Sequence, residues 1–355
     1  MIRSALIAAL LALTAAGCAP IIQRPGIPGA DFTGPRLTDD AFISYDGAKL
    51  GMEHWQPAKG EPWAVIVGLH GINDYSNAFH LAAPYWASDG IATYAFDQRG
   101  YGRSAQRGVW PGEPAMTEDL RVFCDLIRKR YPHTIIAVAG VSMGGAVTIE
   151  AFASDRPPSA DRVVLLAPAV WGWSTQPLPY KTTLWLTAHV APSLDLEPPR
   201  FLSDNIQASD NIDELRRMGR DPLMLWGARV DALYGLVQLM EHASRDVGKI
   251  KPPTLYLTGD HDQFVPPPAA RRAAKNLKAG DRSGDYAAGW HLLLVDLQAQ
   301  TVYRDVENFI RDPSAPLPSG APPIPVKSVV NSSAAVAADH GAGGGRQAAI
   351  EGTGG

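Results

Sequence analysis

A serine flanked by two glycines stands where it could act as a nucleophile. The stretch Gly140-Val141-Ser142-Met143-Gly144 has the pattern G-x-S-x-G, with an apolar run before it and a helical pattern after it. A sharp turn from strand to helix would lift the Ser142 hydroxyl above a sheet. It would also place the Met143 N–H where negative charge develops during attack on a carbonyl group. The pattern therefore indicates nucleophilic acyl transfer.

A serine hydroxyl reacts only when a base removes its proton, and histidine is the usual base. Four histidines follow Ser142 before the C-terminal stretch 312–355, namely His189, His242, His261 and His291. His189 and His242 fall within a long helical stretch that lies too far from the expected sheet edge. His291 follows a strand-like stretch and precedes the last predicted helix, where a loop could bring it over Ser142. We expect His291 to be the base, with His261 as its competitor.

A carboxylate must orient the base and stabilise its charged form, and in this arrangement it lies between the serine and the histidine in the chain. Asp260 and Asp262 both follow the predicted strand 254–258. Asp262 is favoured because the residues after it lead into a helix, whereas Asp260 could be a turn residue that bonds its own backbone. Asp296 comes after the histidine, and we interpret it as a surface or capping residue.

A second donor to the developing oxyanion should come from the loop after an early strand. That loop reads Leu69-His70-Gly71-Ile72-Asn73, and the Ile72 N–H is our candidate because Gly71 permits a tight turn. His70 is expected to shape the loop by hydrogen bonding. No Cys/His spacing indicates a metal site, and the predicted chemistry calls for no cofactor.

The elements that would position these residues alternate between strand and helix. Asp46-Gly47 predicts a hairpin between 41–45 and 49–55. The other predicted strands are 63–69, 91–96, 134–141, 162–166 and 254–258, and the predicted helices are 77–88, 117–131, one from 142, and 268–278. Continuous apolar strands alternating with helices predict an α/β protein with a mostly parallel sheet flanked by helices. The helical stretch of about 169–250 interrupts this alternation and predicts a lid inserted between two strands.

The two ends of the chain differ from this folded part, which we expect to span 37–311. Residues 1–17 have a positive start, a short apolar run and small residues, which is typical of a signal peptide. Cys18 directly after them resembles the lipidation site of bacterial lipoproteins; the alternative is a plain secretory signal with an incidental cysteine. Residues 18–36 would then be a tether. The Pro/Ala/Gly-rich stretch 312–355 is predicted to be a disordered tail.

Composition narrows the possible partners. The net charge is −4 and no run of Lys or Arg is longer than three residues, so a nucleic-acid partner is not expected. Besides Cys18, the chain has a single cysteine, Cys124, which falls on the apolar side of a predicted helix and reads as a buried free thiol. The expected partners are a lipid or small ester substrate and, through a lipid on Cys18, a membrane. No oligomeric state follows from the sequence.

Several motifs together resemble the monoacylglycerol lipase and lysophospholipase branch of the α/β hydrolases, the serine aminopeptidase S33-like group. They are Leu69-His70-Gly71, the stretch from Phe96 to Ser104, Gly140 to Gly145, Asp221-Pro222-Leu223, Leu257 to Asp262, and Gly289-Trp290-His291. The resemblance covers about residues 41–311 and implies an α/β-hydrolase fold with a lid. It implies a triad of Ser142, Asp262 and His291, with oxyanion donors at Ile72 and Met143. Val141 departs from the family, which commonly has His there.

The resulting expectation is a serine hydrolase that cleaves carboxylic esters of lipids, monoacylglycerol or lysophospholipid, through an acyl-enzyme on Ser142. The alternatives are an aminopeptidase or amidase, a general short-chain carboxylesterase, and a non-catalytic envelope lipoprotein that keeps the fold. Six lid residues could line an acyl channel or form lid core, namely Leu184, Trp185, Leu186, Leu236, Leu239 and Met240. The expected location is the bacterial cell envelope, with the protein lipid-anchored. Ala19 after the cysteine resembles lipoproteins on the periplasmic side of the outer membrane in a Gram-negative host.

Overall fold

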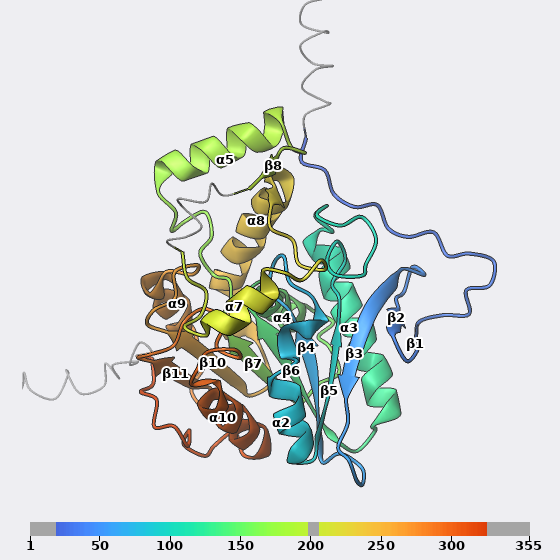
Figure 1. Ribbon diagram of the computed structural model, residues 1–355, viewed down its shortest axis with the longest axis vertical. Helices are drawn as coiled ribbons and strands as arrows, with labels where there is room; N and C mark the ends of the chain where they lie inside the picture. The colour runs from blue at the N-terminus through green and yellow to red at the C-terminus, as the bar shows by residue number, and fades with distance from the viewer. Residues whose placement is uncertain (1–18, 198–205, 325–355) are drawn as a thin grey trace, which may run out of the picture.

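The computed structural model describes residues 19–197 and 206–324, and a nine-stranded sheet lies at their centre (Figure 1). The strands lie in the order β1-β2-β3-β5-β4-β6-β7-β10-β11. Their bounds are β1 Arg36–Leu37, β2 Ala41–Ile43, β3 Lys49–Trp55, β4 Ala64–Leu69, β5 Ile91–Phe96, β6 Ile135–Val141, β7 Arg162–Leu166, β10 Thr254–Gly259 and β11 Arg282–Tyr286. Neighbours from β5 to β11 pair in parallel, whereas β1, β2 and β3 pair antiparallel. The predicted mostly parallel sheet is confirmed.

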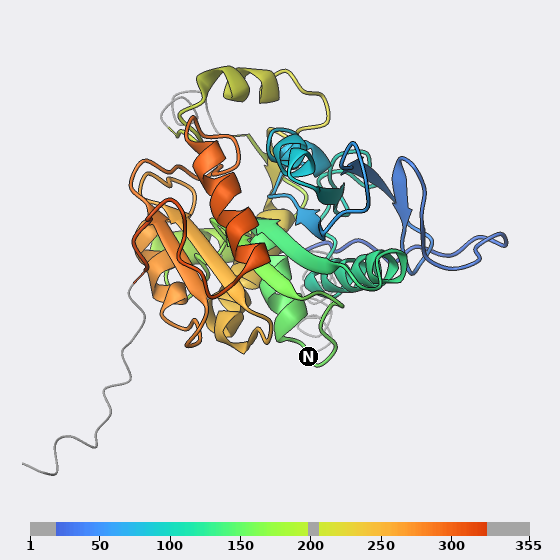
Figure 2. The same cartoon turned by 90° about the horizontal axis from the view of Figure 1, so that it is seen from below.

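Helices cover both faces of this sheet, as the view from below shows (Figure 2). On one face, α2 (Ala82–Ser88) packs against α10 (Ala299–Arg311), and the Trp86 indole N–H donates to the Tyr303 carbonyl at 3.1 Å. On the other face lie α3 (Glu113–Arg130), α4 (Met143–Ala153), α8 (Val230–Asp246) and α9 (Pro267–Ala274). The predicted helix 77–88 is divided into the 3₁₀ turn η1 (Ser76–Phe79) and α2.

The central strands form because their residues suit burial on both faces. Every residue of β4 and β5 is buried, and so is nearly all of β6. Successive side chains of a strand point to opposite faces. Accordingly Val65 and Val67 pack with α3 and α4, whereas Ala64 and Ile66 pack with α2 and α10. This double burial makes the central strands a rigid base for loops at their carboxyl ends.

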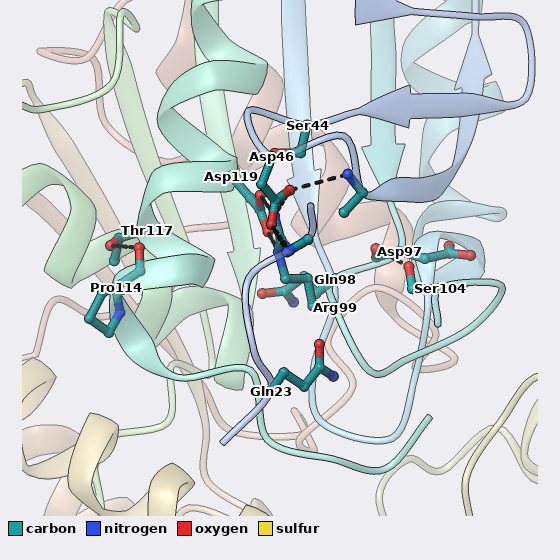
Figure 3. A network of polar contacts seen from close by, with 12 residues as sticks. Gln23, Ser44, Asp46, Asp97, Gln98, Arg99, Ser104, Pro114, Thr117 and Asp119 are labelled. Carbon is teal, nitrogen blue, oxygen red and sulfur yellow. Dashed lines mark hydrogen bonds and ion pairs between the residues drawn. The ribbon is translucent and has the colours of Figure 1, made fainter. Parts of the chain in front are cut away.

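A buried ion network ties the first hairpin to the loop after β5 (Figure 3). Arg99 donates to both oxygens of Asp46 at 2.7 and 2.8 Å and to both oxygens of Asp119 at 2.6 and 2.8 Å. The Ser44 hydroxyl donates to Asp119 as well. The arginine and both aspartates have side chains no more than 6 % exposed. The stretch after Phe96 is therefore structural.

The chain between β7 and β10, residues 167–253, is an insertion that carries the predicted lid. It contains α5 (Leu178–Val190), β8 (Asp195–Leu196), α7 (Ile212–Met218), β9 (Ala228–Arg229), α8 and the short turn η2 (Val247–Lys249). In Figure 1, α5 lies at the top, away from the sheet, and α8 runs from there down to the body. Leu236, Leu239 and Met240 of α8 are buried in the main core, so α8 is a layer of the domain as well as a support for α5.

Both ends differ from their predictions where the structure describes them. The segment predicted as a tether is bound to the domain, because the Gln23 N–H donates to the Trp110 carbonyl at 2.9 Å and the Gly26 N–H to Asp46 at 2.6 Å. The tail predicted to be disordered from residue 312 is packed as far as 324. Ile324 is 2 % exposed, and the Asp285 N–H donates to the Pro322 carbonyl at 3.0 Å. Composition did not indicate that residues 312–324 are packed, because a few spaced apolar residues are enough to cover the edge strand β11.

Within the described residues, no helix has the length and apolar character that a membrane span requires. Cys124 is fully buried and free, as predicted.

Replacing Arg99 with Ala should lower the free energy of unfolding by about 3–5 kcal/mol, because two buried carboxylates would lose their counter-ion. Arg156→Ala is the matched control, since Arg156 is 72 % exposed and pairs with Glu118 at the surface; its cost should stay within about 0.5 kcal/mol. Urea unfolding of both variants measures the difference. A loss no larger for Arg99→Ala than for Arg156→Ala would contradict a structural role for the network.

Candidate active site

Ser142 lies in a sharp turn between β6 and α4. Its backbone has φ 51° and ψ −115°, in the region of positive φ that residues with a side chain rarely adopt. Holding such a conformation costs on the order of 1–3 kcal/mol, and it persists only where its surroundings enforce it. Here the Ser142 N–H donates to the Leu166 carbonyl at 3.0 Å, and its carbonyl accepts from Ala169 at 2.9 Å. Neighbouring chain therefore holds the predicted nucleophile in place.

The glycines around Ser142 make this turn sterically possible. A Cβ atom on Gly144 would lie 2.3 Å from the Leu69 carbonyl oxygen, and one on Gly140 would lie 2.5 Å from the Gly144 oxygen. A Cβ on Gly145 would meet Pro168 at 2.8 Å. These contacts explain why small residues precede and follow the serine, and they place α4 directly against the end of β4.

His291 and Asp262 meet beside the carboxyl ends of the strands, each on a loop. His291 Nδ1 contacts Asp262 Oδ2 at 2.8 Å, and both residues are at most 7 % exposed. Asp262 is itself oriented, because its Oδ1 accepts from the N–H groups of Phe264 and Val265 at 2.8 and 2.9 Å. A carboxylate at Nδ1 fixes the tautomer whose Nε2 can accept a proton. The ring of Phe264 stacks on the imidazole with centroids 5.0 Å apart.

The competing candidates have other contacts. Asp260 is 40 % exposed and pairs with Arg271. His261 packs against the Trp290 ring with centroids 5.1 Å apart. On the insertion, His189 stacks on Trp185. The structure thus brings Asp262, not Asp260, to His291, while the catalytic roles of Ser142, Asp262 and His291 stay predictions.

The loop of the second predicted oxyanion donor lies against the nucleophile. A Cβ on Gly71 would sit 3.3 Å from the Ser142 Cβ and 3.9 Å from its Oγ, so Ile72 follows at a point of close approach. Met143 is the first residue of α4, and the first N–H groups of a helix have no partner within the helix. Both N–H groups remain candidate donors to an oxyanion.

His70 holds this loop, as expected from its position. Its Nδ1 donates to the Gly71 carbonyl at 2.7 Å, and its Nε2 accepts from the Gln98 N–H at 2.8 Å. Complete burial lowers the pKa of His70 to about 4. The ring is therefore neutral at pH 7 and is a fixed support for the loop.

The insertion also bonds to residues 71–75, the loop that carries the predicted oxyanion donor Ile72. These contacts were not predicted from the sequence. The Leu225 N–H donates to the Asn73 carbonyl at 2.9 Å, and the Asn73 amide donates to the Gly227 carbonyl at 3.3 Å. The Tyr75 hydroxyl donates to Asp221 at 2.8 Å. The motif Asp221-Pro222-Leu223 was the one sign of this attachment in the sequence. Through Asp221 it bonds the insertion to the loop.

The interpretation of Asp296 as a surface or capping residue is wrong. Asp296 is 3 % exposed, and its Oδ2 accepts the Trp290 N–H at 2.8 Å, directly beside His291 in the chain. Local sequence could not indicate this burial, because the groups near Asp296 include Ser209 and Asp210 of the insertion, which are distant from it in the chain.

The predicted acyl-channel residues divide into two groups. Those on α8 lie in the core and Leu184 of α5 packs against it, whereas Trp185 and Leu186 on α5 are 53 % and 58 % exposed. These two line a surface hollow of about 490 Å³ together with Trp173, Lys181, Thr182 and Tyr234. The α5 residues thus form an apolar surface over the sheet's carboxyl edge.

One group of side chains away from the triad could hold a cation. The ligand atoms of Glu113, Glu150 and His242 lie within 4.8 Å of one another, between α3, α4 and α8. His242 Nδ1 contacts Glu113 at 2.8 Å. The group contains no triad residue, so it plays no part in the predicted reaction.

The comparisons agree with this arrangement. The family described as serine aminopeptidase, S33, matches residues 60–298. The chain belongs to this hydrolase family. A human monoglyceride lipase is 26 % identical over 294 residues, 79 % of this chain and 93 % of that protein. A monoacylglycerol lipase from Mycolicibacterium smegmatis is 25 % identical, covering 77 % and 96 %.

Solved structures share the fold. The crystal structure of the Paleococcus ferrophilus monoacylglycerol lipase superposes with a TM-score of 0.61 at 23 % identity, covering 75 % of this chain and 99 % of that one. A thermostable carboxyl esterase from Bacillus coagulans gives 0.64 at 18 % identity, with coverages of 80 % and 100 %. The α/β-hydrolase fold and the family expected from the motifs are confirmed, and the protein is a serine hydrolase.

Replacing Asp262 with Asn should lower kcat on a short p-nitrophenyl ester by on the order of 10³–10⁴-fold, because the imidazolium would lose its counter-charge and its fixed tautomer. Asp260→Asn makes the same change two residues away, on a carboxylate that pairs with Arg271. It should keep activity within about twofold. Equal losses in the two variants, at unchanged melting temperature, would contradict the assignment of Asp262.

Proposed function

We propose that the protein hydrolyses carboxylic esters of monoacylated lipids, monoacylglycerol or lysophospholipid, through an acyl-enzyme on Ser142. The observation that carries the proposal is the buried Asp262–His291 pair in a fold that holds Ser142 in a strained turn. Relatives that align over more than nine-tenths of their own length are named monoglyceride or monoacylglycerol lipases. The exposed apolar surface of α5 adds support for a substrate with an acyl chain.

The proposed reaction begins when His291 Nε2 takes the Ser142 proton as Oγ attacks the ester carbonyl carbon. The N–H groups of Met143 and Ile72 stabilise the resulting oxyanion, and Asp262 stabilises the imidazolium. The intermediate collapses as His291 protonates the leaving alcohol, which leaves the acyl group on Ser142. Water then attacks this ester with His291 as base, and the carboxylic acid leaves as the serine regains its proton.

Contacts on the insertion argue against the aminopeptidase alternative. An aminopeptidase needs carboxylates free to hold the substrate's ammonium group. Glu214 is already bonded by Arg217 at 2.7 Å and approached by His80 at 3.3 Å, and Asp213 pairs with Arg216 and is 93 % exposed. These carboxylates are neutralised or solvated, which favours an uncharged ester as the substrate.

Ser142→Ala should abolish hydrolysis of a long-chain monoacylglycerol, lowering kcat by about 10⁴-fold or more. Ser154→Ala, at the end of the same helix, is the control, because its hydroxyl donates only to the Ala151 carbonyl in the described residues. The wild type should prefer monoacylglycerol over a prolyl amide by kcat/KM. Preference for the amide would support the aminopeptidase, and preference for acetyl esters a short-chain carboxylesterase; either result would overturn the proposal.

We also propose that the mature protein is anchored to the bacterial cell envelope by a lipid on Cys18. Cys18 lies outside the described residues. Gln23 is bound to the domain, and five residues of chain reach at most about 18 Å, so such an anchor would hold the enzyme close to its lipid substrates.

The anchor is tested by expressing the full chain and Cys18→Ser in a bacterial host supplied with an alkyne-labelled fatty acid. The wild type should carry the label and sediment with membranes, whereas the variant should be unlabelled and released from them. An unlabelled wild type would overturn the lipid anchor and support a plain secretory signal.

A further inference from the structure

Asp296 is a buried carboxylate that the proposed reaction does not use. It lies five residues after His291, in the stretch that leads from β11 to α10, and it is 3 % exposed. Its Oδ2 accepts the Trp290 N–H at 2.8 Å, and its Oδ1 is buried without a well-formed hydrogen bond within the described residues. A buried carboxylate with so few donors is costly to keep ionised, so its presence calls for a compensating role.

The insertion bonds to the stretch that contains Asp296. Four hydrogen bonds join residues 207–211 to the loops that carry the proposed base and acid. They are Leu292 N–H to the Ala208 carbonyl at 2.9 Å, Leu297 N–H to Asp210 at 2.8 Å, the Asn211 amide to the Val295 carbonyl at 2.9 Å, and Gln207 N–H to Gln263 at 2.9 Å. The insertion is thus bonded to the stretch that follows His291 and, through Gln263, to the loop that carries Asp262.

The charged groups that act on Asp296 come from this same neighbourhood. Burial raises the pKa of Asp296 to about 6; the Trp290 N–H, the Ser209 hydroxyl and His291 act to lower it, and Asp210 acts to raise it. Tyr303, whose pKa is raised chiefly by burial, also faces Asp296. Among these groups the one that can carry a positive charge is His291, and it does so after it has taken the Ser142 proton.

We propose that Asp296 is a positioning residue for the proposed base: it holds the Trp290–His291 turn, and its negative charge stabilises the imidazolium form of His291. The two carboxylates then act on His291 in different ways. Asp262 bonds Nδ1 directly and sets the tautomer, whereas Asp296 acts through the backbone of Trp290 and through its charge. This inference rests on the proposed function of His291.

The test is Asp296→Asn in the full chain, assayed on a short p-nitrophenyl ester across pH. The amide keeps an oxygen that can accept the Trp290 N–H but removes the charge. We expect kcat/KM to fall about 10-fold and the acid limb of its pH profile to move to lower pH, because a nearby negative charge favours the protonated form of an imidazole. The fall should appear in kcat, with KM changed less than twofold.

Asp281→Asn is the matched control, because Asp281 also accepts backbone N–H groups, those of Thr254 and Lys278, but lies at the amino ends of β10 and β11, away from the His291 loop. It should leave the acid limb in place. An unmoved acid limb in Asp296→Asn, or equal shifts in both variants, would overturn the proposal. If Asp296→Asn fails to fold, Asp296→Ser provides the same comparison, since a hydroxyl oxygen is uncharged and can accept the N–H.

Stability gives a second readout that a purely structural role would not produce. The pKa of Asp296 is raised in the folded state, so the carboxyl stabilises the fold below about pH 4 and loses that contribution as pH rises through about 6. Asp296→Asn should therefore melt at the same or a higher temperature than the wild type at pH 7. A lower melting temperature together with lost activity would indicate a structural residue and contradict the proposal.

These variants distinguish an error in the proposed triad from an error in the proposed role of Asp296. If Ser142→Ala and Asp262→Asn retain full activity, the proposed triad is wrong and Asp296 has no base to position. If those variants are inactive and Asp296→Asn matches the wild type in both rate and pH profile, the triad stands and the role of Asp296 is wrong.

Discussion

The positive φ of Ser142 is the constraint on which the site depends. The turn that holds Ser142 at φ 51° needs glycines at 140, 144 and 145, because a Cβ there would clash with Gly144, with Leu69 of β4 and with Pro168, respectively. Buried parallel strands provide the rigid base for this turn, and the bonds of Ser142 to Leu166 and Ala169 keep it from relaxing. For the proposed reaction, the loops that carry His291, Asp262 and Ile72 must be placed relative to this turn.

Much of this could be predicted from the sequence because its signals are local. The G-x-S-x-G pattern, the apolar strands and the order of serine, acid and histidine each need only a short window. The sequence favoured Asp262 over Asp260, but the contacts that decide between them are seen only in the structure. The N–H groups of Phe264 and Val265 bond Asp262 and orient it toward His291. The packing of residues 23–26 and 312–324 was missed for a related reason: a polar, Pro-rich composition says little about a few anchoring contacts.

The insertion is where sequence reasoning reached least far, because its contacts join residues distant in the chain. It was expected as a lid over the site. It also contacts two parts of the site directly. Residues 221–227 bond to Asn73 and Tyr75, next to the predicted oxyanion donor Ile72. Residues 207–211 bond to the stretch that follows His291. The exposed apolar helix α5 and these attachments belong to one insertion. The helix α5 is therefore connected through the chain to both loops, and Asp296 is buried close to one of them.

The central claim is that Ser142 is the nucleophile of this fold, and covalent trapping tests it most directly. A fluorophosphonate reacts with an activated serine hydroxyl and leaves a stable adduct that peptide mass mapping can locate. The account predicts one adduct per chain, on the peptide containing Ser142, and at least a hundredfold slower labelling in His291→Ala, because the serine then lacks its base. An adduct on another residue, or ester hydrolysis that persists while Ser142 stays unlabelled, would contradict it.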